Sequence, residues 1–356
     1  MPSKPQLSIQ DLSSGKPNNS SHLDQVAIII VTYNSQNYIA RCLQSIKENC
    51  KNYKIFLYDN DSKDETLQIV RRETEHTNIE TFEGVANLGF GKANNACLNE
   101  ALNQDFQCFF LVNHDVYVTK GLLKELTILH KYTIENGRRS ILCPVQLDGE
   151  GDRIDRNFSM YLRECNVPEC NVDTLKALRT VVRGQFFNAA AWFMGREIVE
   201  EVGGFNPLFE HYGEDNDFAN RALAKGVDFD CPLWLNVHHD REQEPAALIS
   251  RDYGYQRMRR YATLLQKATQ PQANLTTLIL SESINQTRNC LGQLRRGRWI
   301  TALAITMATF KLLFSIPAII ESRSTTKDSR RPFLASTNNK SKERLNKQNP
   351  SRVLAQ

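Results

Sequence analysis

The sequence predicts an α/β protein with a mainly parallel, Rossmann-like sheet that is flanked by helices. Apolar, β-branched runs alternate with stretches of helical periodicity from about residue 26 onward, as in repeated strand–helix–strand units. Three polar clusters, with the sequences TYN, DND and NHD, each follow directly after an apolar run. Because ligands of open parallel sheets bind beyond the carboxyl ends of the strands, these clusters indicate where a site would lie.

The first predicted strand begins near Val26. Its sequence, VAIIIVTY, is apolar almost throughout, as expected of a strand that is buried on both faces. Ile39, Leu43 and Ile46 then recur at three- and four-residue steps, which predicts an amphipathic helix. The second predicted strand is KIFLYD at 54–59, and the carboxylate-rich turn DNDSKDE leads from it into another helix.

Later elements follow the same alternation at first and become less regular afterwards. A short strand is expected at 79–82, then the loop GVANLGFGKANN and a helix through 96–102. The run FQCFFLV at 106–112 has no polar face, which indicates a central strand. Further strands are expected in ILCPVQL, FNAAAWFMG and CPLWLNVHHD, and FANRALAKG is a predicted helix that ends at Gly226.

The chain divides into four expected regions. They are a disordered leader at 1–24, the main α/β domain at 25–245, a helical extension at 246–320, and a basic disordered tail at 321–356. The tail holds nine Lys or Arg residues and three Asp or Glu residues, whereas the whole chain carries a net charge of +4. The main domain is therefore not basic, and we expect no nucleic acid among its partners.

Cysteine usage and the N-terminal residues favour a cytoplasmic protein. The nine cysteines include no CxxC pair, which argues against structural zinc, and several lie in apolar runs, as reduced buried thiols do. The leader contains no apolar segment of the signal-peptide kind.

The segment 299–320 is a candidate for membrane association. Its sequence, WITALAITMATFKLLFSIPAII, is long and apolar enough to span a bilayer, but Lys311 and Pro317 interrupt it and RRGR precedes it. Three arrangements stay open at this point: packing on the main domain, lying on the inner face of the plasma membrane, or spanning the membrane.

A candidate metal site follows the strand FQCFFLV. The carboxylate of Asp115 at the end of this strand can hold Mg²⁺ or Mn²⁺, which would neutralise a nucleotide diphosphate, and the amide oxygen of Asn113 can assist. His238 and His239 end the strand LWLNV, and a neutral imidazole can complete a metal shell. Side chains alternate along a strand, so at most one of the two rings faces the site. Taken singly, these residues fit a strand-ending turn or a surface histidine equally well.

The candidates for nucleotide binding lie at or just beyond strand ends. They are Thr32, Tyr33, Asn34, Asp59, Asp61, Asn87, Gly89 and Asn94. A carboxylate such as that of Asp59 can accept hydrogen bonds from a base or a ribose, the ring of Tyr33 can stack on a base, and Gly89 lets the backbone approach a phosphate. The alternative for the acids is an Asx turn that caps the next helix.

Glu214 and Asp215 open a predicted helix, where the helix dipole favours negative charge. An ionised carboxylate in this position can accept the proton of an acceptor hydroxyl. The alternative is plain helix capping.

Five segments in one order resemble the family 2 glycosyltransferases. They are VAIIIVTYNSQNYIARCLQSI, LYDNDSKDET, ANLGFGKANN, FLVNHDVYV and GEDNDFANRA. The resemblance covers about residues 26–240 and is strongest to the rhamnosyltransferase-like enzymes of bacterial surface polysaccharides. It implies a GT-A fold and inverting transfer of a sugar, rhamnose or another hexose, from a nucleotide-diphosphate sugar to a hydroxyl of a glycan or lipid-linked acceptor.

The resemblance also implies roles for individual residues. The nucleoside would be held by Thr32, Tyr33, Asn34 and Asp59, and the ribose and sugar by the loop containing Asn87, Gly89 and Asn94. Asp115 matches the last acid of the metal-binding D-x-D motif, and Asn113 stands where many relatives have Asp. Asp215 matches the general base, with Glu214 as the substitute, and His239 or His238 matches a histidine that contacts metal or diphosphate.

Two other functions are weaker alternatives. A sugar nucleotidyltransferase would need a basic phosphate-binding loop after the first strand, and VTYNSQNY has no Lys or Arg. A catalytically weak nucleotide-sugar-binding or scaffolding protein would lack the acids of the site, yet Asp59, Asp115 and Asp215 are present.

Overall fold

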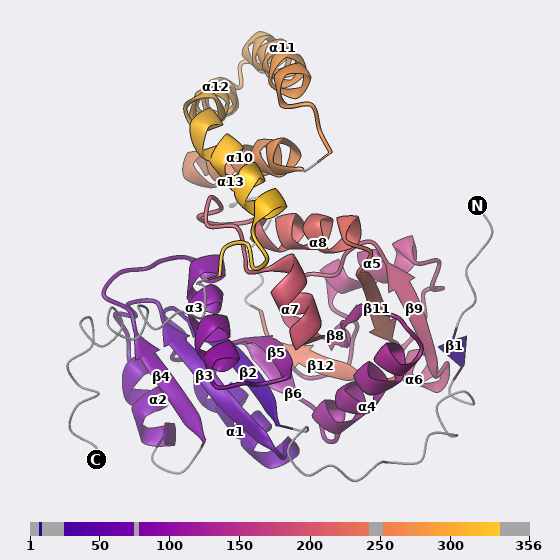
Figure 1. Ribbon diagram of the computed structural model, residues 1–356. Coiled ribbons are helices and arrows are strands. Elements are labelled where there is room, and N and C mark those ends of the chain that lie inside the picture. Colours follow the sequence, from indigo (N-terminus) through magenta and orange to yellow (C-terminus); the bar gives the residue numbers. More distant parts are fainter. Residues whose placement is uncertain (1–6, 9–24, 75–77, 242–251, 271, 335–356) are drawn as a thin grey trace.

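The computed structural model describes residues 7–8, 25–74, 78–241, 252–270 and 272–334. The strands lie in an α/β body, and a cluster of C-terminal helices stands on one side of it (Figure 1).

The larger sheet has nine strands in the order β1-β9-β11-β7-β10-β5-β2-β3-β4. These strands are β1 (Leu7–Ser8), β2 (Val26–Thr32), β3 (Tyr53–Asp59), β4 (Ile79–Glu83), β5 (Cys108–Asn113), β7 (Ser140–Leu142), β9 (Thr180–Gly184), β10 (Ala191–Gly195) and β11 (Asp228–Pro232). The block β5-β2-β3-β4 is parallel, and β10 runs antiparallel to β5. The predicted α/β class with its parallel central sheet is confirmed.

A second sheet has three strands. Its order is β6 (Val116–Val118), β12 (Asn236–His239) and β8 (Val145–Leu147), so the central strand is β12.

Helices cover both faces of the larger sheet. Those of the body are α1 (Ile39–Asn49), α2 (Thr66–Thr74), α3 (Phe90–Asn103), α4 (Leu122–Glu135), α5 (Arg156–Glu164), α6 (Val172–Ala177), α7 (Arg196–Val202) and α8 (Glu214–Ala224). The C-terminal cluster consists of α10 (Tyr253–Thr269), α11 (Leu275–Arg295), α12 (Trp299–Phe314) and α13 (Ile316–Asp328).

The apolar strand β2 is buried on both faces, as its sequence predicts. Ala27 and Ile29 belong to one core with residues of α3, α7 and α8, while Ile28 and Ile30 belong to a second core with residues of α1, α2 and α4. Alternate side chains of one strand therefore hold both helix layers on the sheet.

The polar residues that end the parallel strands lie side by side. Thr32 of β2 pairs with Asp59 of β3, and Val31 of β2 pairs with Asn113 of β5. The clusters TYN, DND and NHD therefore share one edge of the sheet, as predicted from their places after apolar runs.

Two predicted strands are each divided between the two sheets. ILCPVQL forms β7 and β8 with Pro144 between them, and CPLWLNVHHD forms β11 and β12. Proline has no N–H to donate, so a ladder cannot continue through it. The division moves Gln146 and His239 into the small sheet, beside Asp115.

The C-terminal helices have an apolar core of their own. Phe209 of the body joins Tyr261, Leu265, Leu312 and other residues of α10, α12 and α13 in this core. Within the described residues no single helix has the length and apolar character needed to cross a membrane; the pair α12–α13, bent by 58°, meets that test only when the two are counted together.

Both predicted terminal regions contain some ordered residues. Leu7–Ser8 pairs with β9, and the rest of the expected leader at 1–24 lies outside the described residues. Of the disordered tail expected at 321–356, the first residues are ordered: α13 continues to Asp328, and the backbone of Pro332 accepts a hydrogen bond from Gly204. Residues 335–356 lie outside the described part.

Candidate active site

Asp59 organises the loop at the end of β3. Its side chain is fully buried, and its Oδ1 accepts hydrogen bonds from Thr32 Oγ1 at 2.8 Å and Ser62 Oγ at 2.6 Å. The backbone N–H of Ser62 donates to Oδ2 at 2.9 Å. Ser62 was not among the predicted site residues, although a serine three positions after a strand-ending acid is a common partner in such turns.

Tyr33 stands at the surface beside this acid. The residue is 46% exposed, so part of it is accessible to a ligand. Asn34 is in a left-handed conformation with φ 47°, and its Oδ1 accepts a hydrogen bond from the backbone of Lys63. Asp61 pairs with the Lys63 ammonium at 2.5 Å, at the rim of the loop rather than inside it.

The loop before α3 is fixed by side-chain amides. Asn60 accepts a hydrogen bond from Leu88 N at 3.1 Å, and Asn87 accepts one from Gly89 N at 2.8 Å. Gly89 has φ 82°, and a Cβ there would lie 2.5 Å from the carbonyl oxygen of Glu210. Glycine is therefore required both by the backbone conformation and by this close approach. Asn94 is buried and donates to Phe90 O within α3, so it stabilises the loop's end rather than projecting from it.

Asp115 and His239 form the centre of the site. Asp115 Oδ2 lies 3.4 Å from His239 Nε2, and β12 brings the two together by pairing His239 with Val116. Burial alone would raise the pKa of Asp115, but the hydrogen bond and charge of His239 outweigh it and hold this pKa at about 2. Asp115 is thus ionised at neutral pH and is available as a ligand.

Two acceptor atoms here lack hydrogen-bond partners among the described residues. They are Asp115 Oδ1 and Asn113 Oδ1, and both are buried. Buried polar atoms are nearly always paired in native proteins, so these oxygens fit a site for a cation or a donor group of a ligand. A carboxylate with an imidazole suits a divalent cation such as Mn²⁺. The described residues contain no cluster of three or more such ligands, so phosphate oxygens and water would complete the shell.

His238 points away from this centre. Its ring packs against the loop containing Gly151, where a Cβ would collide with it, and burial lowers its pKa. Of the two predicted histidines, the structure therefore brings only His239 to Asp115.

A polar path runs from the Asp115–His239 pair to the next acids. His239 Nδ1 lies 3.0 Å from Gln146 Oε1, and the Gln146 amide donates to Asn188 Oδ1. The adjacent backbone N–H of Ala189 hydrogen-bonds to Asp215. Sequence reasoning missed Gln146 and Asn188; their signal was a polar residue inside the apolar runs ILCPVQL and FNAAAWFMG.

Glu214 and Asp215 begin α8 after Gly213, which has φ 93°. Burial, and then the charge of Asp215, raise the pKa of Glu214 to about 7. Burial also raises the pKa of Asp215, although hydrogen bonds from Asn216 and Ala189 oppose the effect. Two neighbouring carboxylates that are partly buried bind a proton at higher pH than isolated carboxylates do, because each disfavours the charge on the other. The neighbouring Asp217 has a structural role, because its Oδ2 forms an ion pair with Nε of the buried Arg221 at 2.9 Å.

These features define the fold. The parallel sheet, with a buried acid and an exposed aromatic ring at adjacent strand ends and an acid–histidine pair beyond the next strand, has the GT-A arrangement. Residues 27–156 match the model of Glycosyl transferase family 2.

Known proteins similar to this chain include glycosyltransferases of different sugars. Poly(ribitol-phosphate) beta-N-acetylglucosaminyltransferase TarS of Staphylococcus aureus strain Mu50 is 32% identical over 103 residues, which are 28% of this chain and 18% of TarS. The chain thus spans less than a fifth of the length of the curated relatives it matches.

Two solved structures are similar in fold. The mannosyltransferase PcManGT of Pyrobaculum calidifontis, in complex with GDP-Man and Mn²⁺, is 16% identical, with 86% of this chain and 92% of that chain covered and a TM-score of 0.50. S. aureus TarS 1–349 in complex with UDP-GlcNAc is also 16% identical, with 87% and 92% covered and a TM-score of 0.49. Placement in a rhamnosyltransferase-like branch stays a prediction.

Proposed function

We propose that this protein is an inverting glycosyltransferase, which moves a hexose from a nucleotide diphosphate to an acceptor hydroxyl in surface polysaccharide or glycolipid synthesis. The observation that carries the proposal is the pair Asp115–His239 at the same sheet edge as Asp59. The buried oxygens Asp115 Oδ1 and Asn113 Oδ1 beside it have no hydrogen-bond partner in the described part of the chain. A site that gathers an ionised acid, a histidine and open acceptor atoms is suited to a cation-bound diphosphate.

The nucleoside would lie over the ends of β2 and β3. Asp59 is fully buried and bound to Thr32 and Ser62, so it would fix the strand ends over which the nucleoside lies. The exposed ring of Tyr33 can stack on the base, and Gly89 lets the neighbouring backbone approach the ribose or the sugar.

Asp115 and His239 would hold a divalent cation, Mn²⁺ or Mg²⁺, with Asn113 nearby. When bound, the cation supplies positive charge where the diphosphate leaving group develops negative charge. Gln146 keeps the His239 ring in the orientation that directs Nε2 toward Asp115, as partners of metal-binding histidines commonly do.

Asp215 is the proposed base. A carboxylate with a raised pKa accepts the proton of an attacking hydroxyl more readily than an ordinary one does. Burial and the charge of Asp215 raise the pKa of Glu214 to about 7, so Glu214 is partly protonated at neutral pH. The hydroxyl oxygen forms a bond to the anomeric carbon as the bond to the diphosphate breaks, and the proton passes to Asp215.

Thermal melting with a panel of donors tests this proposal. The panel holds UDP-GlcNAc and GDP-Man, the nucleotides bound in the similar structures, together with nucleotide-activated rhamnose. At least one donor should raise the melting temperature with Mn²⁺ present, because a ligand that binds only the folded state stabilises it. If none of them does so at saturating concentration, the proposal is wrong.

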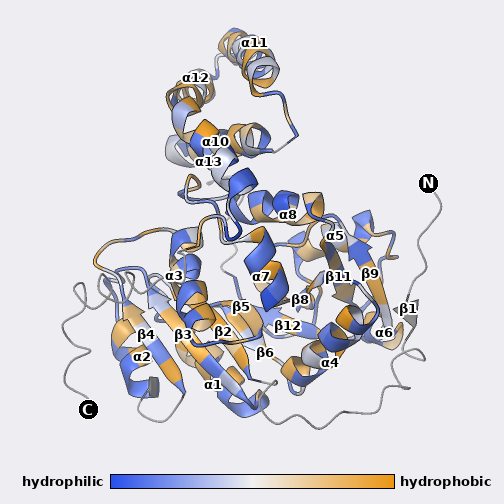
Figure 2. Cartoon of the chain, in the orientation of Figure 1, coloured by the Kyte–Doolittle hydropathy of each residue, from blue (hydrophilic) through white to orange (hydrophobic). Residues whose placement is uncertain are grey.

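We also propose that the protein is cytoplasmic and touches the inner face of the plasma membrane through α11 and α12. Much of α12 is coloured as hydrophobic in Figure 2. Large apolar side chains that repeat at helical spacing along this helix are exposed, among them Trp299 at 69% and Phe314 at 84%. Arg288, Arg295 and Arg298 are exposed beside them. The one acid of α11, Glu282, is buried and paired with Lys267, and α12 has none. An apolar face rimmed by cations fits an anionic lipid surface.

Vesicle flotation tests the membrane contact. Vesicles containing phosphatidylglycerol should carry the protein upward, and the double change Trp299→Ser with Phe314→Ser should abolish this. Met160→Ser, which removes an exposed apolar side chain from the body, is the matched control. If instead the double change only splits a dimer and vesicles never bind, the face contacts a second copy and the membrane proposal fails.

A further inference from the structure

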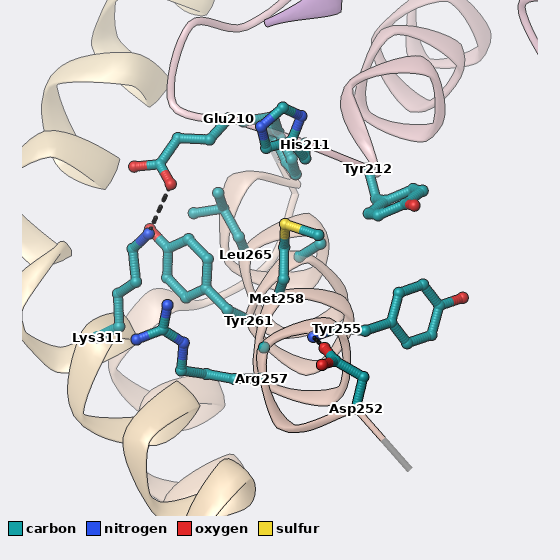
Figure 3. Close-up of a pocket in the computed structure, with 13 residues that line it drawn as sticks. Glu210, His211, Tyr212, Asp252, Tyr255, Arg257, Met258, Tyr261, Leu265 and Lys311 are labelled. Atoms are coloured by element: carbon teal, nitrogen blue, oxygen red, sulfur yellow. Dashed lines mark hydrogen bonds and ion pairs between the residues drawn. The ribbon is translucent and has the colours of Figure 1, made fainter. Parts of the chain in front are cut away.

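A cavity lies outside the strand-end site, between the loop before α8 and the C-terminal helices (Figure 3). It has a volume of about 390 Å³, which lies within the usual range of small-molecule sites. Its walls come from Phe209 to Tyr212, from α10 and from Lys311 of α12. None of the strand-end residues of the proposed donor site lines it.

The cavity combines an apolar floor with a polar, aromatic rim. Phe209, Tyr261 and Leu265 form the buried floor. The rings of Tyr212 and Tyr255 meet edge to face at the rim, with centroids 5.9 Å apart. Sugar rings present apolar C–H faces and hydroxyl edges, so aromatic faces with nearby charged groups match them.

The rim carries the charged side chains of Lys311, Glu210 and Arg257. Lys311 pairs with Glu210 at 2.9 Å, and its ammonium lies over the Tyr261 ring. Arg257 is exposed, its guanidinium lies over the Tyr253 ring at 5.8 Å, and it forms no ion pair within the described part of the chain. Its guanidinium can therefore donate to hydroxyl oxygens without giving up an ion pair.

The cavity wall is continuous with both parts of the proposed site. The carbonyl of Glu210 lies against Gly89 of the donor loop. Tyr212 and Gly213 both have positive φ, 64° and 93°, and they lead directly into Glu214 and Asp215. Gly213 also packs so closely on Gln266 of α10 that a Cβ would collide with it. The loop that forms the wall thus also positions the start of α8.

We propose that this cavity is an acceptor subsite that binds one sugar unit of the acceptor glycan, with Tyr255 and Arg257 as its contact residues. The proposal rests on the proposed function, which supplies an acceptor and a base. It adds that the C-terminal helices select the acceptor, and that the unit bound here lies next to the unit whose hydroxyl approaches Asp215.

Ligand-observed NMR on the full chain tests the subsite with the methyl glycosides of glucose, galactose, N-acetylglucosamine and rhamnose as probes. At least one glycoside should show saturation transfer from the wild-type protein. Tyr255→Ala and Arg257→Gln should each remove most of that signal, and Tyr132→Ala, on the distant helix α4, should keep it. Arg257 is exposed, so its variant gives the answer even if Tyr255→Ala does not fold.

Two results overturn the subsite: no transfer from wild type to any of the four glycosides, or equal transfer in the wild type and Arg257→Gln. Calorimetry of UDP and GDP with Mn²⁺ on the same wild-type sample separates this from the proposed function. Nucleotide binding without glycoside binding contradicts the subsite alone. If a glycoside binds and its binding depends on Arg257, but neither nucleotide binds, the sugar-binding cavity is supported and the proposed transferase function is contradicted.

Discussion

His239 Nε2 lies 3.4 Å from Asp115 Oδ2, although the two residues are more than a hundred positions apart in the sequence. The pairing of β12 with β6 creates this contact, and Gln146 on β8 holds the other ring nitrogen. The next residue toward the N-terminus, His238, faces the opposite side of the small sheet. This arrangement gives a matched pair of histidines for testing the metal site.

His239→Ala should weaken nucleotide binding in the presence of Mn²⁺ by about 10- to 100-fold, as is usual when a residue of a metal site is lost. His238→Ala, the control, should bind the nucleotide as the wild type does. Titration calorimetry with UDP or GDP checks both. Equal losses in the two variants would mean that the histidines act only through stability.

Asp215→Asn should lower the transfer rate by about 10²- to 10⁴-fold, because the amide cannot accept the acceptor's proton. Nucleotide affinity should stay near that of the wild type, since Asp215 lies on α8 rather than at the strand ends. Glu214→Gln should have the smaller effect on rate. Turnover that is unchanged in Asp215→Asn would refute the assignment of the base.

The pKa of Glu214, raised from 4.5 to about 7, predicts how stability depends on pH. Between these two values the folded protein binds a proton at this carboxyl that the unfolded chain has already released, so stability falls as pH rises through this interval. Glu214→Gln removes this loss. The variant should therefore gain melting temperature relative to wild type between pH 5 and 8, by a few degrees. A difference that stays constant over this range would contradict the raised pKa.

Gly89→Ala should reduce nucleotide binding and activity, because alanine strains a backbone with φ 82° and its Cβ would press on the carbonyl of Glu210. Gly121 has nearly the same backbone conformation, φ 80°, but no atom lies within 4 Å of a Cβ built there. Gly121→Ala should therefore cost only about 1 kcal/mol of stability and leave binding intact. Assays of both variants separate backbone strain from the contact with Glu210.

The sequence alone predicted the fold class and the edge of the sheet where the site lies. Buried strands have a strong apolar pattern, and Asp59 and Asp115 stand where that pattern stops. The sequence could not decide which of His238 and His239 faces Asp115. Both residues end the same apolar run, and only the pairing of β12 with β6 determines which ring lies at Asp115.

Other features depend on contacts between distant segments. Gln146 and Asn188 each lie in an apolar run, and their hydrogen bond joins strands that are far apart in the chain. Asp217 stood in the acidic cluster of the predicted base, yet it pairs with Arg221 inside the body. The sequence predicted a basic tail around Pro332, because the hydrogen bond that the backbone of Pro332 accepts comes from Gly204, which is remote in the sequence.

The most direct test of the account is titration calorimetry of UDP and GDP against the wild-type protein and Asp115→Ala, each with Mn²⁺ and with a chelator in place of the metal. We expect the wild type to bind one of the nucleotides at least about tenfold more tightly with Mn²⁺, because in the proposed site the ionised carboxylate of Asp115, together with His239, would hold a cation that neutralises the diphosphate. Asp115→Ala should lose this gain. Equal wild-type affinity with metal and with chelator, or a gain that survives Asp115→Ala, would contradict the central claim.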